Sequence, residues 1–265
     1  MLSDPACLGN LPSAAADSIF DPEYWRARGE LVDATAGRGS AWFIAPAGLQ
    51  ESSGPQQATG LQQSGVQHAC PQPWVLRHYR RGGFIARLSQ DRYLWAGEDR
   101  VRAFSEWRLL EFMRQRGLPV PKPVAARYER AGPWYRCDLI MERIVEAQPL
   151  SAALALDAIP ESAWRAAGDA VARLHGAGVD HADLNAHNLL LGPAGASVID
   201  FDRGRVRAPG GWPLRNLRRL QRSLVKISRG LPPGRYTAQC WEWFMAGYGA
   251  TARATAGATG GRGAA

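Results

Sequence analysis

Long apolar runs and closely spaced cysteines are both missing from this sequence. No stretch reaches the roughly 20 consecutive apolar residues of a membrane-spanning helix, and the start, MLSDPACLGN, lacks the basic and apolar regions of a signal peptide. The four cysteines show no C-x-x-C spacing, which speaks against a zinc site or a disulfide framework. These absences favour a protein that works in a reducing compartment, either free in the cytoplasm or bound to a membrane surface.

Lysine is also scarce. Only Lys122 and Lys226 stand among 32 basic residues, so arginine carries almost all of the formal net charge of +8. A basic chain favours anionic partners such as nucleotide, phosphorylated glycolipid, anionic membrane or nucleic acid. Because alanine and glycine are abundant too, part of the arginine excess reflects a general composition bias, and the charge alone defines no function.

The pattern of apolar residues predicts two parts of different structure. Residues 1–20 are expected to form a flexible N-terminus, and residues 21–144 a sheet-rich part with one main helix over 101–117. Residues 50–72 are rich in Gln, Ser, Gly and Pro and are predicted to be a mobile insertion. Asp21 and Pro22 have the pattern of a helix start.

Residues 145–249 are predicted to be mainly helical, and residues 250–265 a disordered low-complexity tail. Helices are expected over 151–157, 161–175, 214–227 and 236–248, the third with an apolar stripe of Leu214, Leu217, Leu220, Leu224 and Ile227. The fold class that follows is α+β, with an antiparallel sheet and one helix in the first lobe and a mainly helical second lobe.

The most informative segment is HADLNAHN, which begins at His181 and is followed by the strand-like VIDFD. Asp183 and Asn188 are five residues apart, and Asp200 follows after a glycine-containing turn. This order is similar to the protein-kinase catalytic loop H-R-D-L-x-x-x-N and its following D-F-G.

The chemistry of phosphoryl transfer requires these residue types. Asp183 would orient the acceptor hydroxyl and accept its proton, while Asn188 and Asp200 would supply oxygen ligands to Mg²⁺. His181 would brace the loop. Each Asp or Asn taken alone is more often a turn residue, and the histidines at 175, 181 and 187 suit no compact metal site at their spacing of six.

The first lobe offers candidates for binding the phosphates of ATP. Gly37, Gly39 and Ser40 lie in a turn between two predicted strands, where backbone amides cover phosphates in related loops, although Trp42 replaces the third glycine and a plain hairpin turn is an alternative. Arg77 takes the place of the usual lysine in Trp74-Val-Leu-Arg77.

A carboxylate should pair with that cation, and a linker between the lobes should bind adenine. Glu106 in helix 101–117 is the preferred partner of Arg77, with Glu111 as the fallback. Segment 139–144 is the predicted hinge, in which Glu142 and Ile144 are assigned to nucleotide binding. ATP is thus expected between the lobes.

Five segments, GRGSAWFI, LRHYRRGGFIARL, RGLPVPKPVAARYER, GVDHADLNAHNLLL and VIDFDRGRVR, closely resemble the 3-deoxy-D-manno-octulosonic acid (Kdo) kinase family of Gram-negative bacteria. The resemblance covers residues 20–228 apart from the insertion. It implies Mg²⁺- and ATP-dependent phosphorylation of the 4-hydroxyl of Kdo on lipid A precursor, in lipopolysaccharide inner-core synthesis. It also implies a peripheral protein on the cytoplasmic face of the inner membrane.

Several alternatives stay open at this stage. A heptose kinase, or an aminoglycoside-type phosphotransferase, shares H-x-D-x-x-x-x-N, and a catalytically dead nucleotide-binding scaffold would explain the missing glycine and lysine. The positive charge is the one feature that suggests binding of nucleic acid, so no nucleic-acid partner is expected. No obligate protein partner is inferred. The basic helix 214–227 could lie on anionic membrane or simply pack on its own lobe. Arginines 80, 81, 203, 205 and 207 suit an acidic glycolipid.

Overall fold

The chain divides into two compact units. The computed structural model describes residues 1–8, 17–35, 40–46, 72–80 and 91–260. The first unit comprises Met1–Trp107 and Lys122–Val145, and the second comprises Arg108–Pro121 and Glu146–Ala265. The sequence predicts a boundary after residue 144, with residues 108–121 in the first lobe. In the structure, residues 108–121 group with the second unit.

The first unit is built on an antiparallel sheet. Within the described residues it has seven strands in the order β1-β6-β7-β4-β3-β2, with β5 paired to β7. The strands are β1 (Leu2–Ser3), β2 (Leu31–Thr35), β3 (Ser40–Ile44), β4 (Trp74–His78), β5 (Tyr93–Leu94), β6 (Pro123–Ala131) and β7 (Trp134–Glu142). Strands β6 and β7 form a hairpin, and Gly132 in its turn has a positive φ of 59°, which glycine adopts readily.

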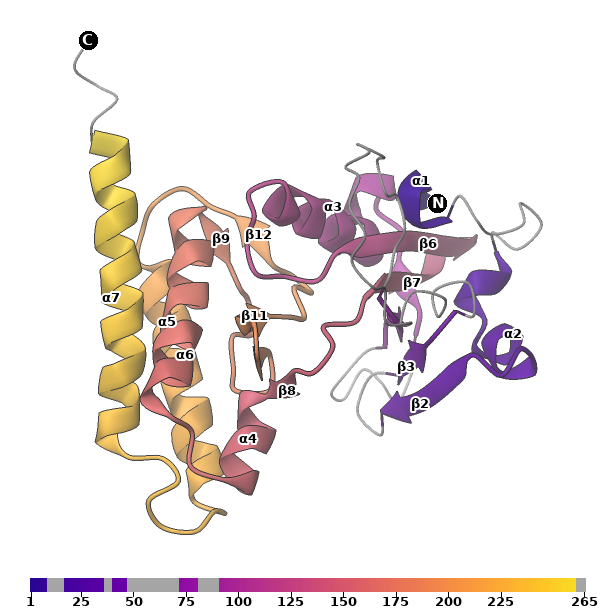
Figure 1. Cartoon of the computed structure of the whole chain (residues 1–265). Coiled ribbons are helices and arrows are strands. Elements are labelled where there is room, and N and C mark those ends of the chain that lie inside the picture. Colours follow the sequence, from indigo (N-terminus) through magenta and orange to yellow (C-terminus); the bar gives the residue numbers. More distant parts are fainter. Residues whose placement is uncertain (9–16, 36–39, 47–71, 81–90, 261–265) are drawn as a thin grey trace, which may run out of the picture. The chain divides into compact units, whose positions relative to one another are not determined.

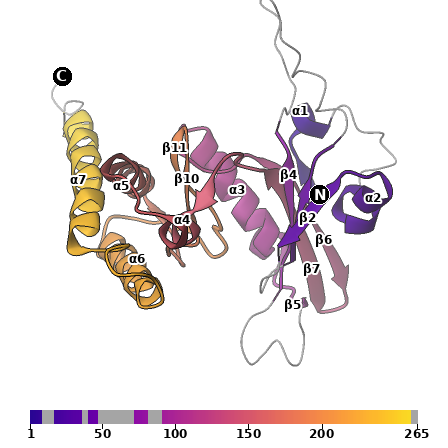
Figure 2. The ribbon, with the colours of Figure 1, turned by 60° about the horizontal axis from the view of Figure 1, so that its bottom comes forward.

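Helices lie on both faces of this sheet (Figure 2). They are α1 (Pro5–Leu8), η2 (Ser18–Phe20), α2 (Pro22–Ala27), η5 (Glu98–Arg100) and α3 (Arg102–Arg114), of which α3 begins in the first unit and ends in the second. Asp21 caps α2 by accepting a hydrogen bond from the Glu23 N–H, and Pro22 follows it as the first helical residue, as the sequence predicts. Trp25 of α2 packs edge-to-face on Trp74 of β4 in the core.

The N-terminal residues differ from the prediction of a flexible segment. Leu2 and Ser3 pair with Ala126 and Ala125 at the edge of the sheet, since short strands add to an exposed edge through backbone hydrogen bonds alone. Cys7 is disulfide-bonded, which the cysteine spacing did not predict.

The second unit contains four helices and five short strands among its described residues. The helices are α4 (Leu150–Leu156), α5 (Glu161–Gly176), α6 (Trp212–Ser228) and α7 (Ala238–Gly260). The strands are β8 (Gln148–Pro149), β9 (Val179–Asp180), β10 (Leu189–Gly192), β11 (Gly195–Val198) and β12 (Arg205–Val206). The α+β fold class predicted from the sequence is confirmed.

Helices α5 and α7 run side by side (Figure 1), and two glycines set how closely they approach. A Cβ atom at Gly168 would lie 2.0 Å from the backbone oxygen of Phe244, and one at Gly247 would lie 2.1 Å from that of Arg165. Only glycine fits at either crossing. This contact fixes α5, the helix that precedes the predicted catalytic loop.

Two details of the predicted helices are wrong. Helix α7 continues to Gly260, so residues 250–260 are helical where a disordered tail was expected; their alanines have high helix propensity. Leu214, expected in the apolar stripe, is 58% exposed. Trp212, two residues earlier at the start of α6, is buried instead.

None of the helices within the described residues is long and apolar enough to cross a membrane.

Candidate active site

The loop after β9 is held by its histidine. The Nε2 atom of His181 donates a hydrogen bond to the carbonyl of Ile199 (3.0 Å), and Nδ1 accepts one from the Asp183 N–H (3.2 Å). The ring lies 4.8 Å from that of Phe201 and is almost fully buried. Burial lowers the pKa of His181 below its ordinary value, although the Ile199 carbonyl and nearby carboxylates oppose this. His181 is therefore a neutral imidazole that joins the loop to Ile199, and its role as a brace in catalysis stays a prediction.

A buried asparagine of α6 holds the same loop from the other side. Asn216 accepts a hydrogen bond from the His181 N–H (3.1 Å) and donates one to Asp180 (3.0 Å). Asp180 also accepts a hydrogen bond from Arg207 at 3.0 Å. Burial raises the pKa of Asp180, but the hydrogen bonds of Arg207 and Asn216 outweigh it and lower the pKa overall. Sequence reasoning missed this network because Asn216 lies far from the motif along the chain.

Asp183 is presented to solvent by this rigid loop. Its side chain is 61% exposed, and its backbone carbonyl accepts hydrogen bonds from Asn185 (2.9 Å) and Asn188 (3.0 Å). One carboxylate oxygen accepts a hydrogen bond from Arg219 of α6 at 2.9 Å. An exposed carboxylate on a braced loop can reach an acceptor hydroxyl, and Arg219, which the sequence did not single out, is its partner here.

The hairpin of β10 and β11 places Asn188 beside the start of the IDFD segment. Leu189 pairs with Val198, and the Ile199 N–H donates to the Asn188 carbonyl at 3.0 Å. Asn188 is buried and its amide nitrogen donates to the Asp183 carbonyl, which turns the amide oxygen away from the loop. Asp200 follows Ile199 directly. The register thus brings the two predicted metal-binding residues to one end of the hairpin.

This donor set fits Mg²⁺. Mg²⁺ binds through one or two carboxylates together with water and substrate phosphates, so an amide oxygen from Asn188 and a carboxylate from Asp200 suffice. Among the described residues, no group of three His, Cys, Asp or Glu side chains is placed to hold a metal ion. A small set of oxygen ligands from the protein suits a cation that also binds phosphate oxygens.

The backbone at Asp200 is strained. Its φ of 64° is left-handed, a conformation uncommon outside glycine, although Asp tolerates it better than most residues. Such positions cost of order 1–3 kcal/mol and are concentrated at functional sites. A carboxylate kept where glycine would fit more easily indicates a role for the carboxylate itself.

In the first unit, the structure brings Arg77 and Glu106 together. The Arg77 Nη1 atom lies 3.2 Å from Glu106 Oε1, and Glu106 is 2% exposed. Tyr79 donates its hydroxyl to the other oxygen of Glu106, and its own burial raises its pKa well above the ordinary value. Glu106 is thus the partner of Arg77, while the fallback, Glu111, lies on the more exposed part of α3.

The predicted hinge has only part of its backbone available. The Glu142 N–H donates to the Lys122 carbonyl (2.8 Å) and the Arg143 N–H to the Pro73 carbonyl (2.6 Å). Ile144 follows β7 and is half-buried. Of the predicted hinge residues, Ile144 is therefore the one whose N–H has no partner among the described residues and could meet adenine.

The glycine-rich turn cannot be placed in the same way. Gly37 and Gly39 lie outside the described residues, and Ser40 begins β3. The β2–β3 hairpin itself is present, with Thr35 opposite Ala41. The predicted contact of Gly37, Gly39 and Ser40 with the phosphates of ATP stays a prediction.

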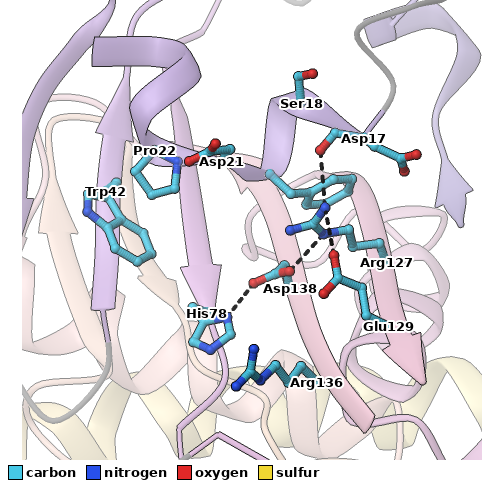
Figure 3. Close-up of a pocket in the computed structure, with 11 residues that line it drawn as sticks. Asp17, Ser18, Asp21, Pro22, Trp42, His78, Arg127, Glu129, Arg136 and Asp138 are labelled. Atoms are coloured by element: carbon cyan, nitrogen blue, oxygen red, sulfur yellow. Dashed lines mark hydrogen bonds and ion pairs between the residues drawn. The ribbon is translucent and has the colours of Figure 1, made fainter. Parts of the chain in front are cut away.

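A cavity of about 490 Å³ in the first unit contains none of the predicted site residues (Figure 3). Asp138 lies between His78 (2.6 Å) and Arg127 (2.9 Å) in its wall, and the hydrogen bond of Asp138 raises the pKa of His78. These charges satisfy one another, which is the pattern of a structural ion-pair network.

A braced loop that exposes Asp183, followed by Asp200, in a chain with an antiparallel sheet and a mainly helical second unit is the pattern expected of a phosphotransferase. Residues 22–248 match the family model described as lipopolysaccharide kinase (Kdo/WaaP) family. The chain belongs to this family, whose members are kinases that use ATP.

Two relatives agree with this assignment. A 3-deoxy-D-manno-octulosonic acid kinase of Stenotrophomonas maltophilia (strain K279a) is 45% identical over 212 residues, which cover 79% of this chain and 75% of that protein. One of Xanthomonas euvesicatoria pv. vesicatoria (strain 85-10) is 46% identical over 215 residues, with coverage of 79% and 75%. A solved structure described as WaaP in complex with acyl carrier protein covers 85% of this chain and 82% of its own, with 17% identity and a TM-score of 0.49.

Proposed function

We propose that this kinase transfers the γ-phosphoryl group of ATP to the 4-hydroxyl of the Kdo sugar on lipid A precursor. The curated relatives at 45% and 46% identity are named Kdo kinases, and the family model spans both units. The observation that carries the proposal is the braced loop that exposes Asp183 next to Asn188. A catalytically dead scaffold would not need this arrangement.

The reaction needs a base, a phosphate clamp and charge neutralisation. Asp183 accepts the proton of the acceptor hydroxyl as its oxygen bonds to the γ-phosphorus, while the bond from that phosphorus to the β–γ bridging oxygen breaks and ADP leaves. Arg77, held by Glu106, contacts the non-transferred phosphates with its guanidinium. Asn188 and Asp200 would hold Mg²⁺, which would neutralise charge on the phosphate oxygens.

The proposed cellular setting is the cytoplasmic face of the bacterial inner membrane. A lipid-linked acceptor is presented at that surface, and a basic chain is attracted to anionic lipid. Helix α6 buries Leu217, Leu220 and Leu224 against its own unit, so its apolar side is used internally. Its basic side is the part available to a charged surface.

The test is an acceptor comparison with product analysis. Purified protein, Mg²⁺ and labelled ATP are incubated with Kdo-bearing lipid A precursor, with the precursor lacking Kdo, and with a heptose-bearing acceptor. Label on the Kdo lipid alone, with the phosphate located at the 4-position by phosphorus–proton NMR, supports the proposal. Phosphate on heptose, or at another Kdo hydroxyl, would overturn the assignment of the acceptor or of the position.

A further inference from the structure

An arginine-lined pocket lies beside the loop that carries Asp183. Its volume is about 440 Å³, and it lies entirely in the second unit. The lining residues come from β9, the segment after it, β12 and α6: Asp180, Ala182, Arg205, Arg207, Arg215, Asn216, Arg218, Arg219 and Arg222. Six guanidinium groups around one cavity, against a single carboxylate, make a strongly positive concave surface.

Helix geometry places four of these arginines together. Arg215, Arg218, Arg219 and Arg222 are spaced by three, four and seven residues, so they share one face of α6. Like charges at this spacing repel one another. A helix that keeps them on one face therefore carries a cost that a bound anion would relieve.

Internal ion pairs use only part of this charge. Arg207 donates to Asp180 at 3.0 Å, and Arg205 lies 4.0 Å from the same carboxylate. Arg215, Arg218 and Arg222 are exposed and have no ion-pair partner among the described residues. Three guanidinium groups thus face the pocket with their charge available.

Arg219 links the pocket to the reaction. It lines the cavity and also donates to Asp183, with 49% of its side chain exposed. While that hydrogen bond is made, one carboxylate oxygen of Asp183 is occupied by the Arg219 guanidinium and does not accept from another donor. An anion in the pocket competes for Arg219 and releases Asp183 to the acceptor hydroxyl.

We propose that this pocket binds an oxyanion of the acceptor, a carboxylate or a phosphate, and that Arg219 couples its arrival to the freeing of Asp183. The inference rests on the proposed function, since it identifies the acceptor as anionic. The planar fork of arginine suits both groups through paired hydrogen bonds, and lysine, which provides a point charge, does not line the cavity.

The test measures binding and transfer separately. The variants are Arg218→Ala, Arg222→Ala and Arg219→Ala, and the matched control is Lys226→Ala, an exposed cation on the same helix outside the pocket. Equilibrium affinity is measured for three micellar probes: Kdo-bearing lipid A precursor, the same lipid without phosphates, and the phosphorylated lipid without Kdo. Vesicles of phosphatidylglycerol form a fourth arm.

The proposal expects each arginine variant to weaken binding of the Kdo-bearing precursor at least tenfold, while Lys226→Ala changes it less than twofold. Weakening confined to the phosphate-free lipid identifies the Kdo carboxylate as the ligand, and weakening confined to the Kdo-free lipid identifies phosphate. The proposed binding of an oxyanion in this pocket would be overturned by unchanged affinity in the arginine variants. An equal loss of affinity in Lys226→Ala, or a loss seen only with vesicles, would overturn it as well. Tight wild-type binding without phosphate transfer would instead overturn the proposed function and leave the pocket standing.

Discussion

The Nε2 atom of His181 donates to the backbone carbonyl of Ile199 at 3.0 Å, so the catalytic loop is tied to the residue directly before Asp200. The bond joins the two halves of the motif, which are separated by the β10–β11 hairpin along the chain. Because the opposite ring nitrogen accepts from the Asp183 N–H, one neutral imidazole fixes the position of both carboxylate-bearing segments. We therefore predict that His181 is a positioning residue that acts through these two hydrogen bonds.

Removing these two hydrogen bonds should slow the chemical step. His181→Phe keeps a ring against Phe201 but leaves the Asp183 N–H and the Ile199 carbonyl without their partner. We expect kcat to fall about 10- to 100-fold through misplacement of Asp183 and Asp200, with little change in KM for ATP. Steady-state kinetics provide the measurement, and His187→Phe, on the exposed side of the same loop, is the control. A rise in KM for ATP at unchanged kcat would contradict a positioning role.

Asn216 should matter for catalysis beyond its effect on stability. Asn216→Ala leaves the buried His181 N–H and Asp180 short of a partner, which costs about 1–3 kcal/mol of unfolding free energy. Leu224→Ala, buried on the same helix, removes packing alone and costs about 2–5 kcal/mol. Denaturant unfolding and kcat are measured on both. We expect a reduced kcat in the folded Asn216→Ala protein only, and equal kcat values would refute the loop-bracing role.

The Arg77–Glu106 pair should control the affinity for ATP. Glu106→Gln keeps the shape and the Tyr79 hydrogen bond but removes the charge that orients Arg77. We expect KM for ATP to rise about tenfold, the effect of weakening one charge-assisted hydrogen bond. Glu111→Gln, on the same helix, is the control and should leave KM unchanged. Equal KM values for ATP in the two variants would contradict the assignment of Arg77 to phosphate binding.

His175 should make the fold less stable in acid. Burial lowers its pKa to about 4, against the hydrogen bond that its Nε2 atom donates to the Asn216 Oδ1 atom and the charge of Asp180. Between pH 6.5 and 4 the unfolded chain therefore binds more protons at this site than the folded one, and the unfolding free energy falls as the pH falls through that interval. The full loss is about 3 kcal/mol.

The measurement is urea unfolding of the wild type and His175→Gln at several pH values. Glutamine does not titrate, so the stability advantage of the wild type should shrink from pH 7 to pH 4.5. Other acidic groups are common to both proteins and cancel in the difference. A constant difference across this range would contradict the assignment of a buried neutral imidazole.

Local patterns were sufficient to predict much of this structure. The cap at Asp21 and the loop from His181 to Asn188 depend on residues close together in sequence. The choice of Glu106 over Glu111 also agrees with the structure, because helical spacing decides which carboxylate faces β4.

The rest depends on packing between distant segments. Asn216 and Arg219 reach the loop only because α6 docks with a particular side inward, and that side was predicted with Leu214 buried when it is exposed. The two-residue strand β1 is too short for any periodicity to reveal it. Helix α7 extends through an alanine-rich segment whose composition is equally typical of a tail.

Transfer of labelled phosphate from Mg-ATP to Kdo-bearing lipid A precursor tests the central claim most directly, with Asp183→Asn and Asp200→Asn beside the wild type. Asp157→Asn, a surface carboxylate paired with Arg235, is the matched control. The account predicts transfer by the wild type and the control, and a loss of at least 100-fold in the other two variants, which should remain folded. Transfer at wild-type rates by either variant, or none by the wild type, would contradict it.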